Sequence, residues 1–232
     1  MGINPYPSDP LRGCVNDAMQ VREMLTKHFG FDTKEKRMLT DESATTANIL
    51  ERLNWLVDGA QPGDTLYFHY SGHGSQMIDS KYDSDEEPDG MDEIICPVDL
   101  NWRDKVIKDE DMKAIFDRVP AGVNLVIVLD CCHSGSGLDQ AVQYQTFGEA
   151  ARGREFGPDS PNRSRHLPMP ADIANRGIGL DLKPRERVTQ SRSVDNTGMM
   201  VSGCQSHQTS ADAWIDNRYI GAATHALTTV LK

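Results

Sequence analysis

The stretch Asn124-Leu125-Val126-Ile127-Val128-Leu129-Asp130 decides the fold class of this chain. It is a nearly continuous run of β-branched and aliphatic residues, which is the composition of a strand buried on both faces of a parallel sheet. The run Thr65-Leu66-Tyr67-Phe68-His69-Tyr70 has the same character, and both runs end in glycine-rich, polar sequence. In such sheets, ligands bind beyond the carboxyl ends of the strands. We therefore predict two buried parallel strands with a functional site where they end.

Amphipathic segments surround these two runs. Residues 17–29 and 45–56 carry apolar side chains at i, i+3 and i+4 spacing, which predicts helices, and a third helix is expected over residues 109–118. Residues 199–202 have the pattern of another strand, and residues 221–231 have that of a closing helix. Strands that alternate with helices are typical of an α/β fold, with a mainly parallel central sheet and helices on both faces.

The 232 residues are expected to form a single domain, because α/β domains of this size commonly fold around one core. Residues 1–142 contain the chemical motifs described below, and residues 198–232 form a smaller closing part. Between them, residues 143–197 are turn-rich, basic and without apolar periodicity. We expect this insert to be a long, flexible loop.

Composition restricts the classes of protein to which the chain can belong. Apolar residues make up 38% and charged residues 25%, which is a globular balance. No run approaches the roughly 18 apolar residues that span a bilayer. The start of the chain fits neither a secretory signal nor a myristoylation site, and the five cysteines are irregularly spaced, so we expect a cytoplasmic protein with free thiols. The net charge of −11 disfavours nucleic acid and anionic membranes as partners and favours basic ones.

A histidine and a pair of cysteines follow the two predicted strands. His73 lies between glycines in Ser71-Gly72-His73-Gly74, and the second run continues into Cys131-Cys132-His133. An imidazolium near a thiol favours the thiolate, which attacks carbonyl carbon atoms. The backbone N–H groups of Gly74 and Cys132 are the expected donors to the oxyanion that forms. These residues predict acyl transfer to a cysteine, with His73 as general acid and base.

Together, the motifs Tyr70-Ser71-Gly72-His73-Gly74 and Asp130-Cys131-Cys132-His133-Ser134-Gly135 resemble the paired signature of the metacaspases, especially type I. The resemblance covers most of the chain, from Leu11-Arg12-Gly13-Cys14-Val15-Asn16-Asp17 to Gln208-Thr209-Ser210-Ala211-Asp212-Ala213. It implies a caspase-like fold, a monomer, and Cys132 as the nucleophile, a choice between the two cysteines that the residues alone leave open. Strand alternation then directs Cys131 into the core.

The resemblance also implies cleavage of protein substrates after Arg or Lys, in a pocket formed by Cys14, Asp17, Ser71 and Asp130. Carboxylates in such a pocket make chemical sense, because a buried guanidinium or ammonium group needs a paired, hydrogen-bonded anion. The alternative for Asp17 is a helix N-cap, since it precedes a periodic apolar segment.

Stimulation by Ca²⁺ is a further implication of the resemblance, with Asp92, Asp109, Glu110 and Asp139 as the ligands. Hard oxygen ligands suit this ion. The acidic run at residues 79–93, which has eight carboxylates, is either another Ca²⁺ site or a solvated loop. It does not match the EF-hand pattern.

Several alternatives remain open. The chain could be a catalytically silent relative that acts as a binding module. A zinc site is conceivable from zinc-type ligands whose spacing matches no standard pattern, namely His69, His73, Cys131, Cys132 and His133. Self-cleavage in the insert or in the acidic run is an alternative to a plain linker, and the candidate arginines of the insert are Arg152, Arg154, Arg163, Arg165, Arg185 and Arg187. Because the first strand of the family begins before the equivalent of Gly2, an edge of the sheet is expected to be incomplete.

Overall fold

The central sheet of the protein is parallel. The computed structural model describes residues 1–32, 34, 37–78, 91–132, 162–174, 198–203 and 210–231. Strands β1 (Thr65–Ser71), β5 (Asn124–Asp130) and β7 (Gly198–Ser202) lie in the order β1-β5-β7, and both pairings are parallel. The register pairs Ser71 with Asp130, so the first two strands end side by side. The prediction of two buried parallel strands is confirmed.

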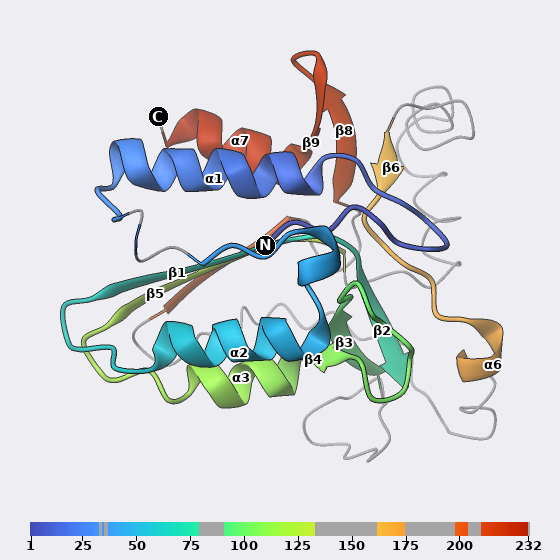
Figure 1. Ribbon diagram of the computed structural model, residues 1–232, viewed down its shortest axis with the longest axis horizontal. Coiled ribbons are helices and arrows are strands. Elements are labelled where there is room, and N and C mark those ends of the chain that lie inside the picture. The colour runs from blue at the N-terminus through green and yellow to red at the C-terminus, as the bar shows by residue number, and fades with distance from the viewer. Residues whose placement is uncertain are drawn as a thin grey trace.

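Helices cover both faces of this sheet. Figure 1 shows α1 (Cys14–His28) and α7 (Ala222–Val230) on one face, and α2 (Thr46–Val57) and α3 (Asp109–Phe116) on the other. The predicted helices and the α/β architecture are therefore confirmed, with helix ends that differ slightly from the expected ones.

The spacing of apolar residues explains how the helices pack. In α2, the buried side chains are Ile49, Leu53 and Val57, which lie on one face of the helix. The hydroxyl of Thr45 accepts a hydrogen bond from the Asn48 backbone N–H at 3.3 Å and so caps the start of this helix.

The main core of the protein includes residues from β1, β5, α2 and α3. The rings of Phe68 on β1 and Phe116 on α3 lie 5.9 Å apart within it. Complete burial of such an apolar side chain contributes roughly 1.5–3 kcal/mol to stability. The sheet is thus fixed against this pair of helices, which makes it a rigid platform for the residues at its carboxyl end.

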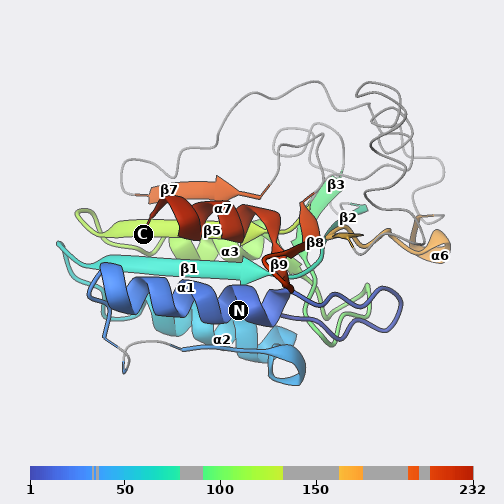
Figure 2. The ribbon, with the colours of Figure 1, turned by 90° about the horizontal axis from the view of Figure 1, so that it is seen from above.

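Two small antiparallel sheets lie beyond the carboxyl ends of the parallel strands. The first contains β2 (Gly74–Ile78), β3 (Met91–Ile95) and β4 (Ile107–Lys108). The second contains β6 (Arg163–Ser164), β8 (Ala211–Ile215) and β9 (Arg218–Gly221). Figure 2 shows β8 and β9 next to the arrowhead of β1. A short helix, α6 (Ala171–Ala174), and a 3₁₀ turn (Asp41–Ser43) complete the described elements.

Local sequence patterns do not predict either small sheet. Both β6 and α6 lie inside residues 143–197, where the sequence predicts a loop. β6 forms because Arg163 and Ser164 pair with Asp212 and Ala211 of β8. This pairing joins segments that are distant in the chain, and a reading of local periodicity cannot detect it.

The first residues of the chain lie beside β1. Gly2 forms parallel bridges with both Ser71 and Thr40, and the terminal amine of Met1 donates to the His69 carbonyl oxygen at 2.6 Å. Backbone pairing at this edge of β1 is therefore present at its carboxyl end. Within the described residues, no helix is both long enough and apolar enough to cross a bilayer.

Candidate active site

The side chain of Arg165 fills an acidic pocket where β1 and β5 end. It is fully buried, and three carboxylates surround its guanidinium group. Nη2 lies 2.6 Å from Asp17 Oδ2 and 3.0 Å from Asp212 Oδ1, and Nη1 lies 3.2 Å from Asp130 Oδ1. Nη1 also donates to Ser71 Oγ at 2.7 Å. The pocket therefore supplies the paired, hydrogen-bonded anions that a buried guanidinium group requires.

Asp130 is fixed in place by residues of the closing part of the chain. Its Oδ2 accepts hydrogen bonds from the backbone N–H of Thr224 at 2.9 Å and from the Thr224 hydroxyl at 2.7 Å, and its Oδ1 accepts one from the Ser210 hydroxyl. Burial by itself would raise the pKa of Asp130, but Arg165 and these hydrogen bonds outweigh it, so the pKa lies below its usual value. The carboxylate is thus held ionised and oriented.

Asp17 and Asp212 are held by backbone donors. The backbone N–H of Gly221 donates to Asp17 Oδ1 at 2.8 Å, and that of Gly13 donates to Asp212 Oδ1 at 2.9 Å. Burial, together with the charge of Asp130, keeps the pKa of Asp17 above its usual value even though Arg165 opposes this shift. With three carboxylates around one guanidinium group, the pocket strongly favours a cation.

Glycine is required where the pocket wall is closest. A Cβ atom at Gly221 would lie 2.2 Å from Asp130 Oδ2 and 2.5 Å from Arg165 Nη1. Both distances are far below van der Waals contact, so any side chain at this position would displace the occupant of the pocket or the carboxylate.

Three of the four residues predicted for this pocket contact Arg165 directly, namely Asp17, Ser71 and Asp130. The fourth, Cys14, is buried and interacts electrostatically with Arg165. Burial raises the pKa of its thiol, which therefore remains neutral beside the carboxylates. Sequence reasoning did not assign Asp212 to the pocket. The available signal was its place in the motif that follows Ser210.

The alternative interpretation of Asp17 as a helix N-cap is wrong. Helix α1 begins at Cys14, and the residue in the N-cap position is Gly13. Asp17 therefore lies within the first turn, and its side chain points to Arg165 and Ser71 rather than to the backbone of its own helix.

The carbonyl oxygen of Arg165 accepts hydrogen bonds from two backbone N–H groups. These donors are Gly74 at 3.0 Å and Cys132 at 3.3 Å, the same pair that the sequence nominates for an oxyanion hole. A Cβ atom at Gly74 would lie 2.2 Å from the Cys132 carbonyl oxygen, so this close approach of the two backbones requires glycine.

The chain forms strand-like pairs with the site on both sides of Arg165, which itself lies at a bend. Before Arg165, β6 pairs with β8, and the Arg165 N–H donates to the Ser210 carbonyl at 3.0 Å. After it, the Leu167 N–H donates to the Gly74 carbonyl at 3.0 Å, and the Ser75 hydroxyl donates to the Leu167 carbonyl at 2.5 Å. Strand-like pairing on both sides of a residue whose side chain fills a pocket is how an extended peptide is bound.

His73 is fully buried and held from two sides. Its Nε2 lies 2.7 Å from the Asp9 carbonyl oxygen, and the Tyr6 ring meets its ring edge-on, with centroids 4.5 Å apart. Burial lowers the pKa of His73, although the carbonyl groups of Asp9 and Arg165 oppose this shift by favouring the protonated ring. Asp9 acts here through its main chain, which explains why the side-chain pattern of the sequence does not identify it.

The two cysteines at the end of β5 have different surroundings. Both are fully buried, and Cys131 belongs to the main core, in agreement with the prediction from strand alternation. The Sγ atom of Cys132 accepts a hydrogen bond from the Ser210 backbone N–H at 2.6 Å. The same Sγ atom lies 3.5 Å from the Ser210 carbonyl oxygen, to which a neutral thiol donates, so the backbone of Ser210 holds Cys132 in place through both of its polar groups. His133 lies outside the described residues.

The residues predicted to bind Ca²⁺ lie around β3, β4 and α3. Asp92, with 2% of its surface exposed, forms an ion pair with Lys108 of β4, and Asp109 and Glu110 form the first turn of α3. Asp139 and most of the acidic run lie outside the described residues. Within the described part, no three His, Cys, Asp or Glu side chains are grouped closely enough to hold a metal ion. The Ca²⁺ ligand set therefore stays a prediction.

The same observation bears on the zinc hypothesis. His69, His73, Cys131 and Cys132 are described, and they do not form a metal-binding group. Instead, His69 Nε2 lies 3.2 Å from the Thr224 hydroxyl, which also contacts Asp130. His69 thus supports the wall of the acidic pocket.

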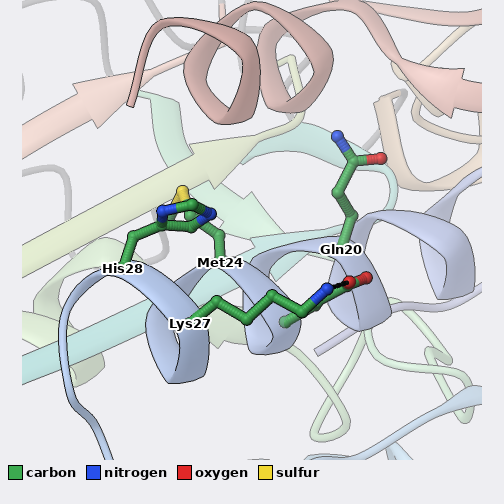
Figure 3. Close-up of a pocket in the computed structure, with 5 residues that line it drawn as sticks. Gln20, Met24, Lys27 and His28 are labelled. Atoms are coloured by element: carbon green, nitrogen blue, oxygen red, sulfur yellow. Dashed lines mark hydrogen bonds and ion pairs between the residues drawn. The ribbon is translucent and has the colours of Figure 1, made fainter. Parts of the chain in front are cut away.

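A separate cavity of about 220 Å³ lies along α1, lined by Gln20, Glu23, Met24, Lys27 and His28. Figure 3 shows these side chains along the helix, with Lys27 turned back towards Gln20. Lys27 pairs with Glu23 one turn earlier in this cavity, and both side chains are exposed. An exposed i,i+4 pair of this kind is ordinary helix surface.

Comparisons with known proteins identify the family of this chain. The model of the family described as "Metacaspase, peptidase C14 domain" matches residues 1–141. This chain belongs to the metacaspase family. The resemblance noted in the sequence is thereby confirmed.

Curated relatives of this metacaspase share about a third of its sequence. Metacaspase-1 of Candida glabrata is 36% identical over 250 residues, covering 100% of this chain and 63% of the relative. Metacaspase-1 of Saccharomyces cerevisiae (strain ATCC 204508 / S288c) is 36% identical, with 58% of the relative covered, and that of Cryptococcus neoformans is 37% identical, with 54% covered. The chain thus spans little more than half the length of these relatives.

A solved structure supports the fold of this metacaspase. The crystal structure of protein GSU0716 from Geobacter sulfurreducens matches 99% of this chain and 78% of that protein, with a TM-score of 0.66 and 25% sequence identity. Together with the family match, this likeness confirms the predicted caspase-like fold.

Proposed function

We propose that this metacaspase is a cysteine endopeptidase that cleaves peptide bonds after Arg or Lys. The observation that carries the proposal is the double engagement of Arg165. Its side chain contacts three carboxylates, while its carbonyl oxygen accepts hydrogen bonds from the Gly74 and Cys132 N–H groups. A residue bound in this way presents its carbonyl group as the substrate of an acyl-transfer enzyme would.

In the proposed reaction, the thiolate of Cys132 attacks the carbonyl carbon of the basic residue. The negative charge that develops on the oxygen is stabilised by the two backbone N–H groups, each worth on the order of 100-fold in rate. The peptide C–N bond then breaks, leaving a thioester on Cys132, and the leaving amine takes a proton from His73. Water, deprotonated by His73, hydrolyses the thioester and releases the new carboxyl end.

The contact with Asp9 supports different roles for the two ring nitrogens of His73. A carbonyl oxygen can only accept, so the proton in the 2.7 Å contact belongs to Nε2. Nδ1 is then the nitrogen that exchanges protons with the thiol, the leaving amine and water. Asp9 thus orients the imidazole through its main chain, the role that a third side chain has in catalytic triads.

The test is hydrolysis of matched fluorogenic peptides that end in Arg, Lys or Asp before the reporter group. We expect cleavage of the Arg and Lys peptides and loss of activity by at least about a thousandfold in Cys132→Ala, because the nucleophile is removed. Preference for the Asp peptide would contradict the proposed specificity.

A catalytically silent binding module is the competing function. It predicts that wild-type protein, shown to be folded, binds the Arg peptide without cleaving it under any condition. Binding measured in parallel by fluorescence anisotropy separates this outcome from a failure to recognise Arg. The buried acidic pocket favours recognition of Arg in either case.

We extend the proposal to self-processing at the Arg165–His166 bond. Of the six arginines considered in the insert, Arg163 and Arg165 lie within the described residues. Arg165 alone of these two has its side chain in the acidic pocket. We expect mass spectrometry to find a fragment that begins at His166 in wild-type protein and not in Cys132→Ala. A fragment that begins elsewhere would move the site of self-processing.

Stimulation by Ca²⁺ is part of the proposal, with Asp92, Asp109, Glu110 and Asp139 as the residues that would hold the ion. Their carboxylates are the hard donors that Ca²⁺ prefers, and it would supply there a positive charge that now comes partly from Lys108. We expect the Arg-peptide activity to fall with chelator and to return with millimolar Ca²⁺. Activity that chelator leaves unchanged would remove Ca²⁺ from the proposal.

A further inference from the structure

A second basic side chain of the bound segment meets an acidic residue of the site. Arg163 lies in β6 and Arg165 follows this strand, and both side chains form ion pairs with carboxylates of the site. Arg163 Nη1 lies 3.4 Å from Asp9 Oδ1. The exposed fractions of these two side chains are 39% and 33%, respectively. This contact is therefore partly solvated, unlike the buried pocket that holds Arg165.

Asp9 is well placed to select substrates because its backbone is fixed to the catalytic centre. Its carbonyl oxygen contacts His73 Nε2 at 2.7 Å. The carboxylate belongs to the same residue as this carbonyl oxygen. The contact with His73 therefore also fixes where the carboxylate lies relative to the reacting bond.

Arg12, the basic residue that follows Asp9 most closely in the chain, is engaged elsewhere. Arg12 donates through Nη1 to the Tyr219 hydroxyl at 2.7 Å and stacks over the Tyr219 ring at 4.9 Å. Its positive charge is therefore directed to β9 rather than to the carboxylate of Asp9. This leaves Asp9 able to attract a cation from a bound peptide.

We infer that Asp9 selects a basic side chain two residues before the one that fills the acidic pocket, so that preferred substrates have the pattern basic–any–basic before the cleaved bond. The inference rests on the proposed peptidase function and adds a second determinant of specificity to it. Because the ion pair is partly exposed, the expected selectivity is modest, about threefold to fivefold.

The experiment uses three peptides, Arg-Ser-Arg, Ala-Ser-Arg and Glu-Ser-Arg, each with the same reporter after the last residue. The enzymes are the full wild-type chain, Asp9→Asn, Asp9→Lys and the control Asp58→Asn, which removes an exposed carboxylate after α2. Asparagine keeps the size of the side chain and the main-chain contact with His73. The readout is the ratio of kcat/KM values between peptides, because the chain's own segment competes equally with all three and cancels in the ratio.

We expect the wild type and Asp58→Asn to prefer Arg-Ser-Arg over Ala-Ser-Arg by about threefold to fivefold, and Glu-Ser-Arg to be the poorest. In Asp9→Asn, the ratio between the Arg and Ala peptides should fall to about 1, and in Asp9→Lys the order should reverse. Raising the salt concentration should reduce the wild-type ratio, since screening weakens exposed charge pairs. A wild-type ratio of 1, or a ratio that Asp9→Asn leaves unchanged, overturns the inference.

Failure of the inference and failure of the proposed function give different results. Equal cleavage of all three peptides overturns the role of Asp9 and leaves the peptidase intact. If no peptide is cleaved, the same ratios are measured as binding affinities to Cys132→Ala and to Cys132→Ala with Asp9→Asn. Selective binding that depends on Asp9 then supports the role of Asp9 although the peptidase proposal fails, and equal binding overturns both.

Discussion

Two groups of acidic residues lie at the carboxyl end of the sheet, and the cations that balance their negative charge come from different parts of the chain. In the pocket, Asp17, Asp130 and Asp212 are fully buried and surround Arg165, which is 148 positions from Asp17 in the chain. Around β3, the nearly buried Asp92 pairs with Lys108 of the neighbouring strand β4.

The difference is between a pocket whose cation belongs to a segment lying in the site and an acidic group around β3 whose cation belongs to a neighbouring strand. The pocket carboxylates accept hydrogen bonds from backbone and hydroxyl groups outside the segment that contains Arg165, so under the proposed function the pocket would stay organised for another basic residue. Lys108 belongs to the scaffold and cannot leave. An ion at the second group must therefore compete with a lysine that is already present.

The largest expected effect concerns the acidic pocket. Asp130→Asn removes one charge from a buried pair, and breaking such a pair costs about 3–5 kcal/mol. We expect kcat/KM for an Arg peptide to fall by on the order of a thousandfold. The control is Asp99→Asn, a carboxylate outside the site that caps α2 through Thr46, which should affect stability and not kcat/KM. A loss of less than about tenfold in Asp130→Asn would mean that the pocket does not select the substrate.

The second prediction tests the acidic group around β3. Lys108→Ala removes a cation that pairs with the nearly buried Asp92, so we expect the free energy of unfolding to fall by about 2–3 kcal/mol in chelator. If Ca²⁺ binds there, millimolar Ca²⁺ should restore the stability of this variant more than that of the wild type. Urea unfolding with and without Ca²⁺ measures both effects. Lys105→Ala, which removes a half-exposed partner of Asp99, is the matched control and should show neither.

The third prediction concerns His69, which supports the pocket through Thr224. Burial lowers its pKa to about 3, so His69 stays neutral in the folded state and takes up a proton on unfolding below pH 6.5. Its contribution to stability is therefore complete above about pH 6.5 and is lost as the pH falls towards 3. His69→Gln should reduce the slope of unfolding free energy against pH, between pH 6 and 4, by up to about 1.4 kcal/mol per unit.

The control for this experiment is His28→Gln, which removes an exposed histidine at the end of α1. Urea unfolding at several pH values measures the slope for the wild type and for both variants. An unchanged slope in His69→Gln would mean that the ring of His69 is protonated in the folded protein as easily as in the unfolded one.

The sequence predicts the parallel sheet and its helices because their signals are local. The apolar run at Asn124–Asp130 and the i, i+3, i+4 spacing of α2 both appear within a few turns of chain. The same strand ends place His73 and Cys132 at one edge of the sheet, and the family resemblance adds Asp17, Ser71 and Asp130.

The remaining features depend on contacts between distant segments. Asp212 reaches the pocket because β8 pairs with β6, and Asp9 orients His73 through a carbonyl group that every residue has. Neither role has a distinctive residue pattern. The insert around Arg165 lacks periodicity because its order comes from the site that it occupies, not from its own sequence.

The anchoring of Leu167 has a kinetic consequence for any cut made beside it. Leu167 is 6% exposed and is held by Gly74 and Ser75, so breaking the Arg165–His166 bond does not free the new amino group. That amine stays near the thioester at an effective concentration far above that of a dissolved peptide. Resynthesis of the bond then competes with hydrolysis. In a peptidase working as proposed, the rate of self-processing is set by how quickly the segment after the cut dissociates from Gly74 and Ser75.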